Sequence, residues 1–373
     1  MKNFKGLEKW KIKKILFGFV LLSVVGIIFL SFTTNALVKS KMEDSEKWDA
    51  TLVQSEQIKQ EVKTRSTNAV EVMVGTQVES IRDISLKGSS FRAEFLVWFM
   101  WEGEEDLNML EHFDIYKGEI KNMTVENGSM SRLEVLEDYH EDGVNYQLAR
   151  CDATIAKYFN TTRFPLDSHQ LLINVQSTYP VDQVVFVADT EKSTYDDTIQ
   201  IAGYQTDDHE VAVRYVRTVN DQSNPALKDK VFIGTELTTS MVINRDGFGL
   251  YIKCFIALAG TITWVLISMF IATYHNVDPI RMVPAALFGT VANIMVGANL
   301  LPDALQMGLL EYVNIWGIIM ILAGALSVIH INHTRSGFKD DAFAASFGKL
   351  MFYTMLLFAV VGNLLLPLSA YMF

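Results

Sequence analysis

The chain has 373 residues, half of them hydrophobic, and a formal net charge of −11. Charged and apolar residues are segregated along the chain. Five apolar runs without charge are each long enough to cross a bilayer, which takes about 20 residues. This pattern excludes a single soluble domain. The two cysteines, Cys151 and Cys254, lie in a polar segment and in an apolar run, so a mutual disulfide is not expected. The five runs are Ile15–Val38, Cys254–Tyr274, Met282–Pro302, Tyr312–Thr334 and Leu350–Phe373.

The first apolar run follows a basic tail, with six lysines and one acid in residues 1–14, which predicts a cytoplasmic N-terminus. We expect residues 1–38 to form this tail and a retained transmembrane helix. A cleaved secretory signal is the alternative, because a basic start, an apolar run and the small residues Thr34, Asn35 and Ala36 also mark a cleavage site. Residues 39–68 are charged and lack Gly and Pro, so we expect a helical linker that reaches roughly 40 Å at 1.5 Å per residue.

Residues 69–248 change to short alternating runs rich in aromatic and β-branched residues, such as FRAEFLVWFMW (91–101) and HQLLINVQS (169–177). Turn signals such as Asn127-Gly128 separate them. About 10 strands without helical patterns between them predict an extracellular antiparallel β-sandwich, immunoglobulin-like in architecture. Residues 39–253 hold 22 basic and 37 acidic residues, a net charge of −15 that favours solubility, concentrates cations and repels nucleic acid.

Residues 249–373 contain the other four apolar runs and predict a four-helix transmembrane domain, with helices over 249–274, 280–302, 308–334 and 346–373. The loop after the second of these helices carries Asp303 and Glu311 and no basic residue. The loop before the last apolar run carries Arg335, Lys339 and Lys349. One topology fits every flank: a multi-pass protein of the inner (plasma) membrane, with a cytoplasmic N-terminus and the β domain in the periplasm or outside the cell.

The stretch RFPLDSHQ (163–170) sets an acid, Asp167, beside a rigid Phe164-Pro165 turn. Taken alone it is a surface turn with a solvated carboxylate. In this chain it resembles the F-P-F-D turn of the pentameric ligand-gated ion channels, the Cys-loop receptor superfamily and its prokaryotic relatives, with Leu166 replacing the second Phe. Further stretches resemble family motifs in the same order: FLVWFMWEGEEDL (95–107), DIYKGEIKNMTVENG (114–128), IQIAGYQTDDHEV (199–211), INRDGFGLYI (243–252) and VANIMVGANLLPD (291–303).

The chain departs from the family pattern in four respects. Lys157 and Leu171 stand where eukaryotic members have the loop disulfide, so the resemblance is to the cysteine-free prokaryotic branch. The first bundle helix, 254–274, lacks the usual proline, and the N-terminal apolar run is an addition. No aromatic residue precedes Phe232 in the loop 217–232, which weakens the case for an aromatic cage around a quaternary amine.

The resemblance implies how the two domains are coupled. The turn residues Phe164, Pro165 and Asp167 would touch the loop 302–309 that follows the pore helix. Asp167 would pair with Arg245, which immediately precedes the first bundle helix, and transmit ligand binding to the pore.

The resemblance also makes 280–302 the pore helix. Its small residues suit close helix packing, and one face at helical spacing reads Leu287, Val291 and Ile294. A ring of these side chains can gate ions by expelling water, although the same pattern is also typical of a lipid-facing stripe. Asp278 and Asp303 would add acidic rings that select cations, while Arg281 lies near the same helix face as Asp278 and can neutralise it.

A ligand pocket in this family lies between adjacent subunits. The aromatic candidates are Tyr116, Tyr179, Trp98 and Tyr146, although packing is the commoner role for each of them, and Trp101 is assigned to the core. No metal-ligand spacing, phosphate-binding loop or nucleophile motif occurs, so we expect no cofactor, no metal and no enzyme.

The resulting hypothesis is a homopentameric, ligand- or proton-gated channel that conducts cations. Its partners would be four further copies, the lipid bilayer, a small ligand or protons, and inorganic ions, with no nucleic acid. A membrane-anchored extracellular sensor or binding protein without conduction is one alternative, and a transporter, which calls for inverted repeats and ionisable residues at the midplane, is the other.

Overall fold

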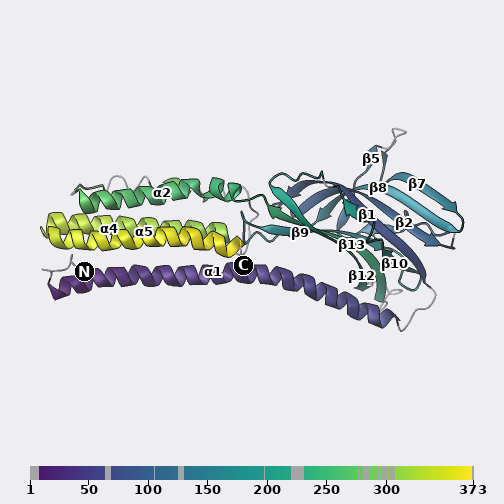
Figure 1. The fold of residues 1–373 in the computed structure, drawn as a ribbon, viewed down its shortest axis with the longest axis horizontal. Coiled ribbons are helices and arrows are strands. Elements are labelled where there is room, and N and C mark those ends of the chain that lie inside the picture. The colour runs from purple at the N-terminus through teal and green to yellow at the C-terminus, as the bar shows by residue number, and fades with distance from the viewer. Residues whose placement is uncertain are drawn as a thin grey trace. The chain divides into compact units, whose positions relative to one another are not determined.

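A computed structural model describes residues 8–63, 69–104, 106–124, 130–196, 198–219, 231–275, 277–279, 286, 288–291, 294–295, 301 and 307–371. The helices are α1 (Lys9–Lys63), α2 (Gly249–Tyr274), α4 (Leu309–Gly337) and α5 (Asp341–Tyr371) (Figure 1). The longer strands are β1 (Val70–Ser85), β2 (Ser90–Glu102), β7 (Glu134–Glu141), β8 (Val144–Ala156), β9 (Ser168–Ser177), β10 (Val184–Ala188), β12 (Tyr204–Val219) and β13 (Val231–Arg245). The shorter strands are β3 (Phe113–Ile115), β4 (Gly118–Ile120), β5 (Met123–Thr124), β6 (Met130–Ser131) and β11 (Thr194–Tyr195).

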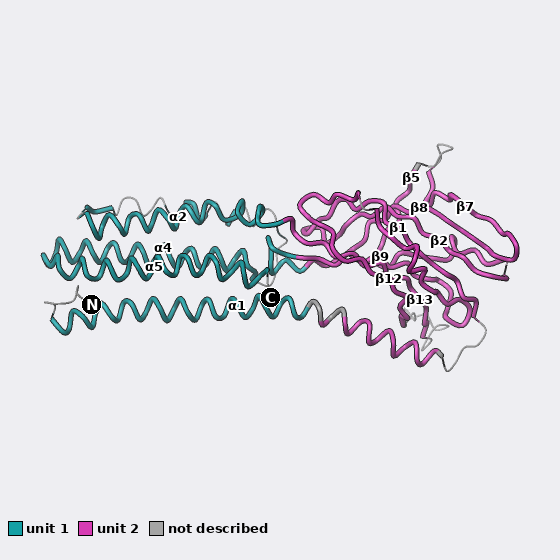
Figure 2. Tube along the Cα trace, viewed as in Figure 1, with its two compact units in different colours: residues 1–43, 160–167, 247–373 teal, residues 44–159, 168–246 magenta. Residues whose placement is uncertain are grey.

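The chain divides into two compact units, coloured separately in Figure 2. The helical unit comprises residues 1–43, 160–167 and 247–373. The strand unit comprises residues 44–159 and 168–246. The helix α1 therefore contributes its first part to one unit and its last part to the other, and the short segment 160–167 belongs with the helices although strands flank it on both sides.

The strand unit contains a seven-stranded sheet, a four-stranded sheet and a small β5–β6 pair. The seven-stranded sheet has the order β10-β1-β2-β8-β4, with β11 beside β1 and β7 beside β8, and the four-stranded sheet has the order β12-β13-β9-β3. The expectation of a purely antiparallel arrangement is wrong at one edge, because β1 runs parallel to both β10 and β11. Parallel neighbours need a long crossover connection, and more than 80 residues separate β1 from β10.

The core of the strand unit follows from the alternation in β2. Phe91, Ala93, Phe95, Val97 and Phe99 are all fully buried, because alternate side chains of a strand point to the same face. The ring of Phe99 lies 5.4 Å from that of Phe113 in the four-stranded sheet. Each buried phenylalanine contributes about 1.5–3 kcal/mol relative to an exposed one.

Four helices among the described residues are long and apolar enough to cross a membrane, which indicates a membrane-embedded protein. They are Lys9–Glu43, Gly249–Tyr274, Leu309–Gly337 and Asp341–Tyr371. The remaining apolar run, Met282–Pro302, falls mostly outside the described residues. Its described part includes Ala286, which packs with Val265 of α2 and Ile321 of α4.

The first part of α1 buries one narrow stripe in the helical unit. Ile15, Leu22, Leu30 and Leu37 are at most 9% exposed and recur at spacings of seven or eight residues, the period of a helix that packs along its neighbours. Phe29 stacks on Trp316 of α4 with ring centroids 5.8 Å apart. At the start of the helix, Lys11 Nζ lies 2.5 Å from the Asp340 carboxylate that precedes α5. The choice between a retained helix and a cleaved signal stays a prediction.

Gly26 tests this packing. A Cβ atom at Gly26 would lie 2.8 Å from the Phe358 ring of α5, so Gly26→Leu should overpack the α1–α5 contact and cost about 1–3 kcal/mol. Thermal unfolding of the detergent-solubilised full chain measures the loss. Gly260→Leu in α2 is the control, because a Cβ there meets nothing within 4 Å. A second measurement is the intact mass of the purified wild-type protein. A mass below 42.1 kDa, caused by loss of the N-terminal segment, would contradict the packing of α1.

Candidate ligand-binding and coupling sites

A cavity of about 260 Å³ lies in the strand unit between the last part of α1 and the four-stranded sheet. Arg214 of β12 and Glu236 of β13 stand opposite each other in the antiparallel register. Their side chains form an ion pair of 2.5 Å and are 9% and 3% exposed. The cavity is lined by Thr51, Gln54, Ser55, Ile58, Tyr116, Gln176, Arg214, Tyr215, Val216, Arg217 and Glu236.

The helix α1 is attached to this sheet by polar and apolar contacts. The backbone N–H of Tyr215, on the edge strand β12, donates to Ser55 Oγ at 2.9 Å. Arg217 and Glu61 form an ion pair at the surface. Ile58 and Val62 pack with Val181 in an apolar cluster, against which Val185, Tyr215 and Ile233 also pack. An unpaired strand edge invites association, and α1 covers part of this one.

The described lining of the cavity contains one acid, Glu236, and two arginines, Arg214 and Arg217. Burial raises the pKa of the Glu236 carboxyl group, and the guanidinium of Arg214 acts in the opposite direction. Removing these two charges from water costs free energy, and their 2.5 Å contact offsets only part of that cost. A polar cavity with a fixed charge pair and neighbouring hydroxyl and amide groups suits a small polar ligand.

Two of the predicted ligand aromatics lie at opposite ends of the short β3–β9 pair. Tyr116 follows β3, is half exposed and lines the cavity, and its backbone N–H donates to Asn174 O at 3.0 Å. Tyr179 follows β9, and its ring centroid lies 4.5 Å from that of His112, which precedes β3. The structure therefore places only Tyr116 at the cavity.

The other two aromatics share one face of the seven-stranded sheet. Trp98 of β2 donates through Nε1 to Asp189 at 3.2 Å and is 9% exposed. The ring of Tyr146 on β8 is tilted against that of Tyr139, with centroids 5.4 Å apart, and its pKa is raised by burial and then by Glu137, Tyr139 and Asp189. Trp101 is buried, as expected for a core residue.

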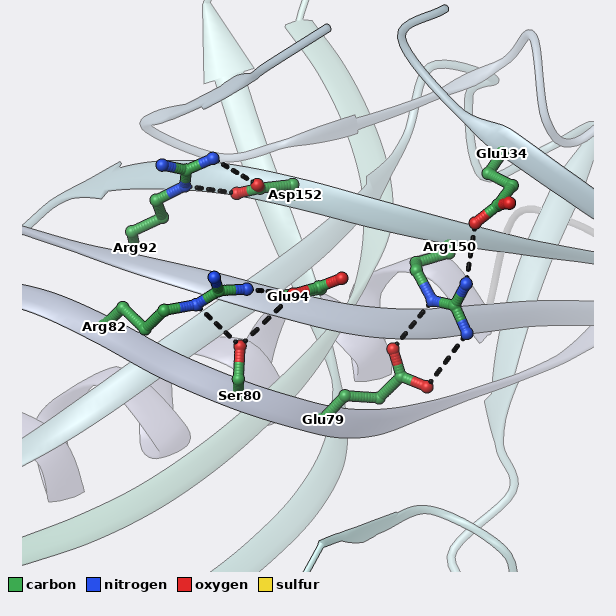
Figure 3. Close-up of polar contacts among 8 residues, drawn as sticks. All are labelled: Glu79, Ser80, Arg82, Arg92, Glu94, Glu134, Arg150 and Asp152. Carbon is green, nitrogen blue, oxygen red and sulfur yellow. Dashed lines mark hydrogen bonds and ion pairs between the residues drawn. The ribbon is translucent and has the colours of Figure 1, made fainter. Parts of the chain in front are cut away.

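The same sheet carries a network of cross-strand ion pairs, drawn in Figure 3. Arg92 and Asp152 bond through two nitrogens, at 2.7 and 2.5 Å. Arg150 bridges Glu79 at 2.8 Å and Glu134 at 2.7 Å, and its pKa is raised, chiefly by the Glu79 hydrogen bond. Arg82 pairs with Glu94 (Figure 3). The network spans β1, β2, β7 and β8, so this face is organised by charge as well as by its aromatic residues.

The turn at 160–167 is anchored inside the helical unit. The carbonyl of Thr162 accepts the Leu309 N–H at the start of α4 at 2.7 Å, and Asn160 Nδ2 donates to Ser40 Oγ of α1 at 3.1 Å. Phe164 and Leu166 are buried, and Asp167 is 1% exposed. Asp167 is therefore not the solvated turn carboxylate of the simpler interpretation. The peptide bond between Phe164 and Pro165 is cis.

The predicted partner of Asp167 belongs to the strand unit. The guanidinium of Arg245 lies over the Tyr204 ring, 4.0 Å from its centroid, in a cation–π contact. Asp167 belongs to the helical unit, so the pairing of the two residues stays a prediction.

The pore candidates are only partly described. Val291 and Ile294 are exposed by 55% and 45%, whereas Ala286 and Thr290 on the same segment are buried. Leu287 and Asp303, like most of the loop 302–309, lie outside the described residues. Asp278 accepts a hydrogen bond from Asn332 of α4, a contact that the sequence did not indicate. Within the described part of the chain, no group of three His, Cys, Asp or Glu side chains is placed to hold a metal ion.

The chain matches no family model, and no curated protein matches it either. The candidate sites therefore depend on their own geometry. Sequence reasoning missed Arg214, Glu236 and the cavity residues of α1. The signal for the charge pair was the opposed charges on two strands of one hairpin, which identifies partners only once the register is known.

Substitutions in the ion pair should show that it is buried. Glu236→Ala leaves the Arg214 charge in a buried site, so it should cost about 3–5 kcal/mol of unfolding free energy. The apolar double variant Arg214→Met/Glu236→Leu should cost less than either single change. Arg217→Ala, which breaks the exposed pair with Glu61, is the control and should cost at most about 1 kcal/mol. Denaturant unfolding of the full chain measures all three variants, and equal losses for Glu236→Ala and Arg217→Ala would disprove the buried pair.

Gly308 tests the contact between the turn and α4. A Cβ at Gly308 would lie 2.4 Å from the Thr162 carbonyl oxygen, a backbone atom that cannot rotate away. Gly308→Val should therefore displace the turn from the helix and cost about 1–3 kcal/mol. The control Gly249→Val places its Cβ where nothing lies within 4 Å. Amide hydrogen exchange at Leu309 should accelerate in the first variant only, and unchanged protection in both variants would show that a side chain at position 308 does not displace the turn.

Proposed function

We propose that this chain is the subunit of a homopentameric, ligand- or proton-gated cation channel, related to the prokaryotic pentameric ligand-gated ion channels. The observation that carries the proposal is the position of the turn. A segment between two strands, 160–167, bonds through Thr162 to the start of α4, immediately after the segment assigned to the pore. A movement of the strand unit would reach the end of the pore segment through this contact.

The proposal includes an immunoglobulin-like sandwich for the strand unit, outside the inner membrane, and a cytoplasmic N-terminus. The basic flanks of the apolar runs support this topology. The two larger sheets offer separate half-sites for a ligand between subunits. Arg214, Glu236 and Tyr116 lie on the four-stranded sheet, and Trp98 and Tyr146 lie on the seven-stranded sheet. In a pentameric ring, the half-site on the four-stranded sheet of each subunit would face the half-site on the seven-stranded sheet of the neighbouring subunit.

The connection between α4 and α5 weakens the sensor alternative. The helix α4 ends at Gly337 and α5 begins at Asp341, so only three residues join them. A sensor needs an output domain on the far side of the membrane, and this connection offers no room for one. A membrane-anchored binding protein that does not conduct ions is the alternative that the conductance measurement below distinguishes from a channel.

The gate in this proposal is the apolar face with Val291 and Ile294, together with Leu287. Exposed apolar side chains on a segment whose other face packs on α2 and α4 support this assignment. Rings of such side chains stop ions when water leaves them. Asp278 and Asp303 would favour cations, as would the acidic strand unit.

Purified full-length protein in planar bilayers tests the function. We expect single-channel currents whose reversal potential under a salt gradient lies near that of the cation, and particles with five-fold symmetry in electron-microscopy class averages. Asp278→Asn should lower the cation preference. A monomer or dimer without conductance, or reversal near the chloride equilibrium potential, would refute the channel or its selectivity respectively.

Val291→Ser should hydrate the constriction and give channels that leak or open more readily. Val360→Ser makes the same chemical change at an exposed position of α5 and should leave the currents unchanged. The measurement is the closed-state current of each variant and of the wild type, recorded at matched protein density. Unaltered leak in Val291→Ser would mean that this face does not line the pore.

A further inference from the structure

A large groove of about 1080 Å³ runs along the helical unit between the first part of α1 and the helices α4 and α5. The additional N-terminal helix forms one of its walls. Most of the lining is apolar and comes from side chains such as Phe17, Leu21, Leu322 and Leu326, which are exposed by 51–69%. Apolar surface of this extent next to a membrane calls for an occupant with hydrocarbon chains.

The polar residues of the groove gather at one end. Lys13 and Lys14 lie near the start of α1, and His330 and His333 lie near the end of α4. The ion pair between Lys11 and Asp340 joins the same ends of α1 and α5, which places all these groups at one level of the helical unit. The described lining contains two lysines and two histidines and no acidic residue.

We infer that this groove binds an anionic phospholipid, with its phosphate at Lys13 and Lys14 and its acyl chains along the apolar walls. Basic pockets between transmembrane helices on the cytoplasmic side recognise anionic head groups. A soluble anion would use only the basic end, and a further protein helix would leave the lysine charges without complement. Only a lipid matches both parts of the groove, and it is the molecule that the bilayer supplies in excess.

The inference does not depend on conduction, because binding is measured on the protein itself. Full-length protein in nanodiscs of mixed phosphatidylglycerol and phosphatidylcholine is transferred to detergent, and the retained lipid is identified by native mass spectrometry. We expect selective retention of phosphatidylglycerol. Lys13→Gln/Lys14→Gln should weaken it about 30-fold, equivalent to about 1 kcal/mol for each lysine.

The control removes the same charge outside the groove. Lys9→Gln/Lys349→Gln alters two lysines that do not line it and should retain the lipid as the wild type does. Ala323→Trp, which fills the apolar part without changing charge, should also release the lipid. The fold of this variant is verified by its unfolding temperature, and the lysine variant decides the question if the tryptophan is not tolerated.

Three results would overturn the inference. Equal retention of phosphatidylcholine would show that charge does not select the occupant. Displacement by glycerol 3-phosphate would show a site for soluble anions. Equal weakening by the two double-lysine variants would show an effect of membrane surface charge rather than of the groove.

Discussion

The helix α1 must be buried against two kinds of partner along one continuous length. From Ile15 to Leu37 it has no charged residue and packs an apolar stripe against helices. Beyond Lys39 it is charged, and in the strand unit its contacts include the Ser55 hydrogen bond to the edge strand β12 and the apolar packing of Ile58 and Val62. Few isolated helices are stable in water, so most of the stability of this helix must come from these partners. Both the groove and the cavity are consequences of where α1 lies.

The cavity in the strand unit follows from this second set of contacts. The cavity is the gap that remains between this part of α1 and the four-stranded sheet. Here the gap contains the Arg214–Glu236 pair instead of an apolar filling. Two apolar residues at these positions would be no less stable, because a buried ion pair hardly compensates its desolvation. We therefore interpret the pair as a specificity element and not as a device for stability.

Prediction from the sequence succeeded where one physical rule acts locally. Uncharged apolar runs located four described membrane helices, and alternation in β2 located a core face. Prediction failed where segments that are distant in the sequence determine the contact. The parallel pairing of β1 with β10, the register that opposes Arg214 to Glu236, and the contact of Asp278 with Asn332 all depend on partners that no local pattern specifies. The four aromatic candidates were separated for the same reason.

The turn at 160–167 shows how a local motif acquires a distant role. The first N–H groups of a helix have no partner within it, so α4 needs acceptors at its start. Glu311 supplies one to the Gly308 N–H at 2.8 Å, and Thr162 supplies another to Leu309. Because Gly308 has no side chain, the Thr162 backbone can approach this closely. A motion that withdraws the turn would leave a buried donor unsatisfied, at a cost of about 1–3 kcal/mol. That is the size of a typical coupling free energy between two sites, so in the proposed channel this one capping contact would be large enough to bias the pore between two states.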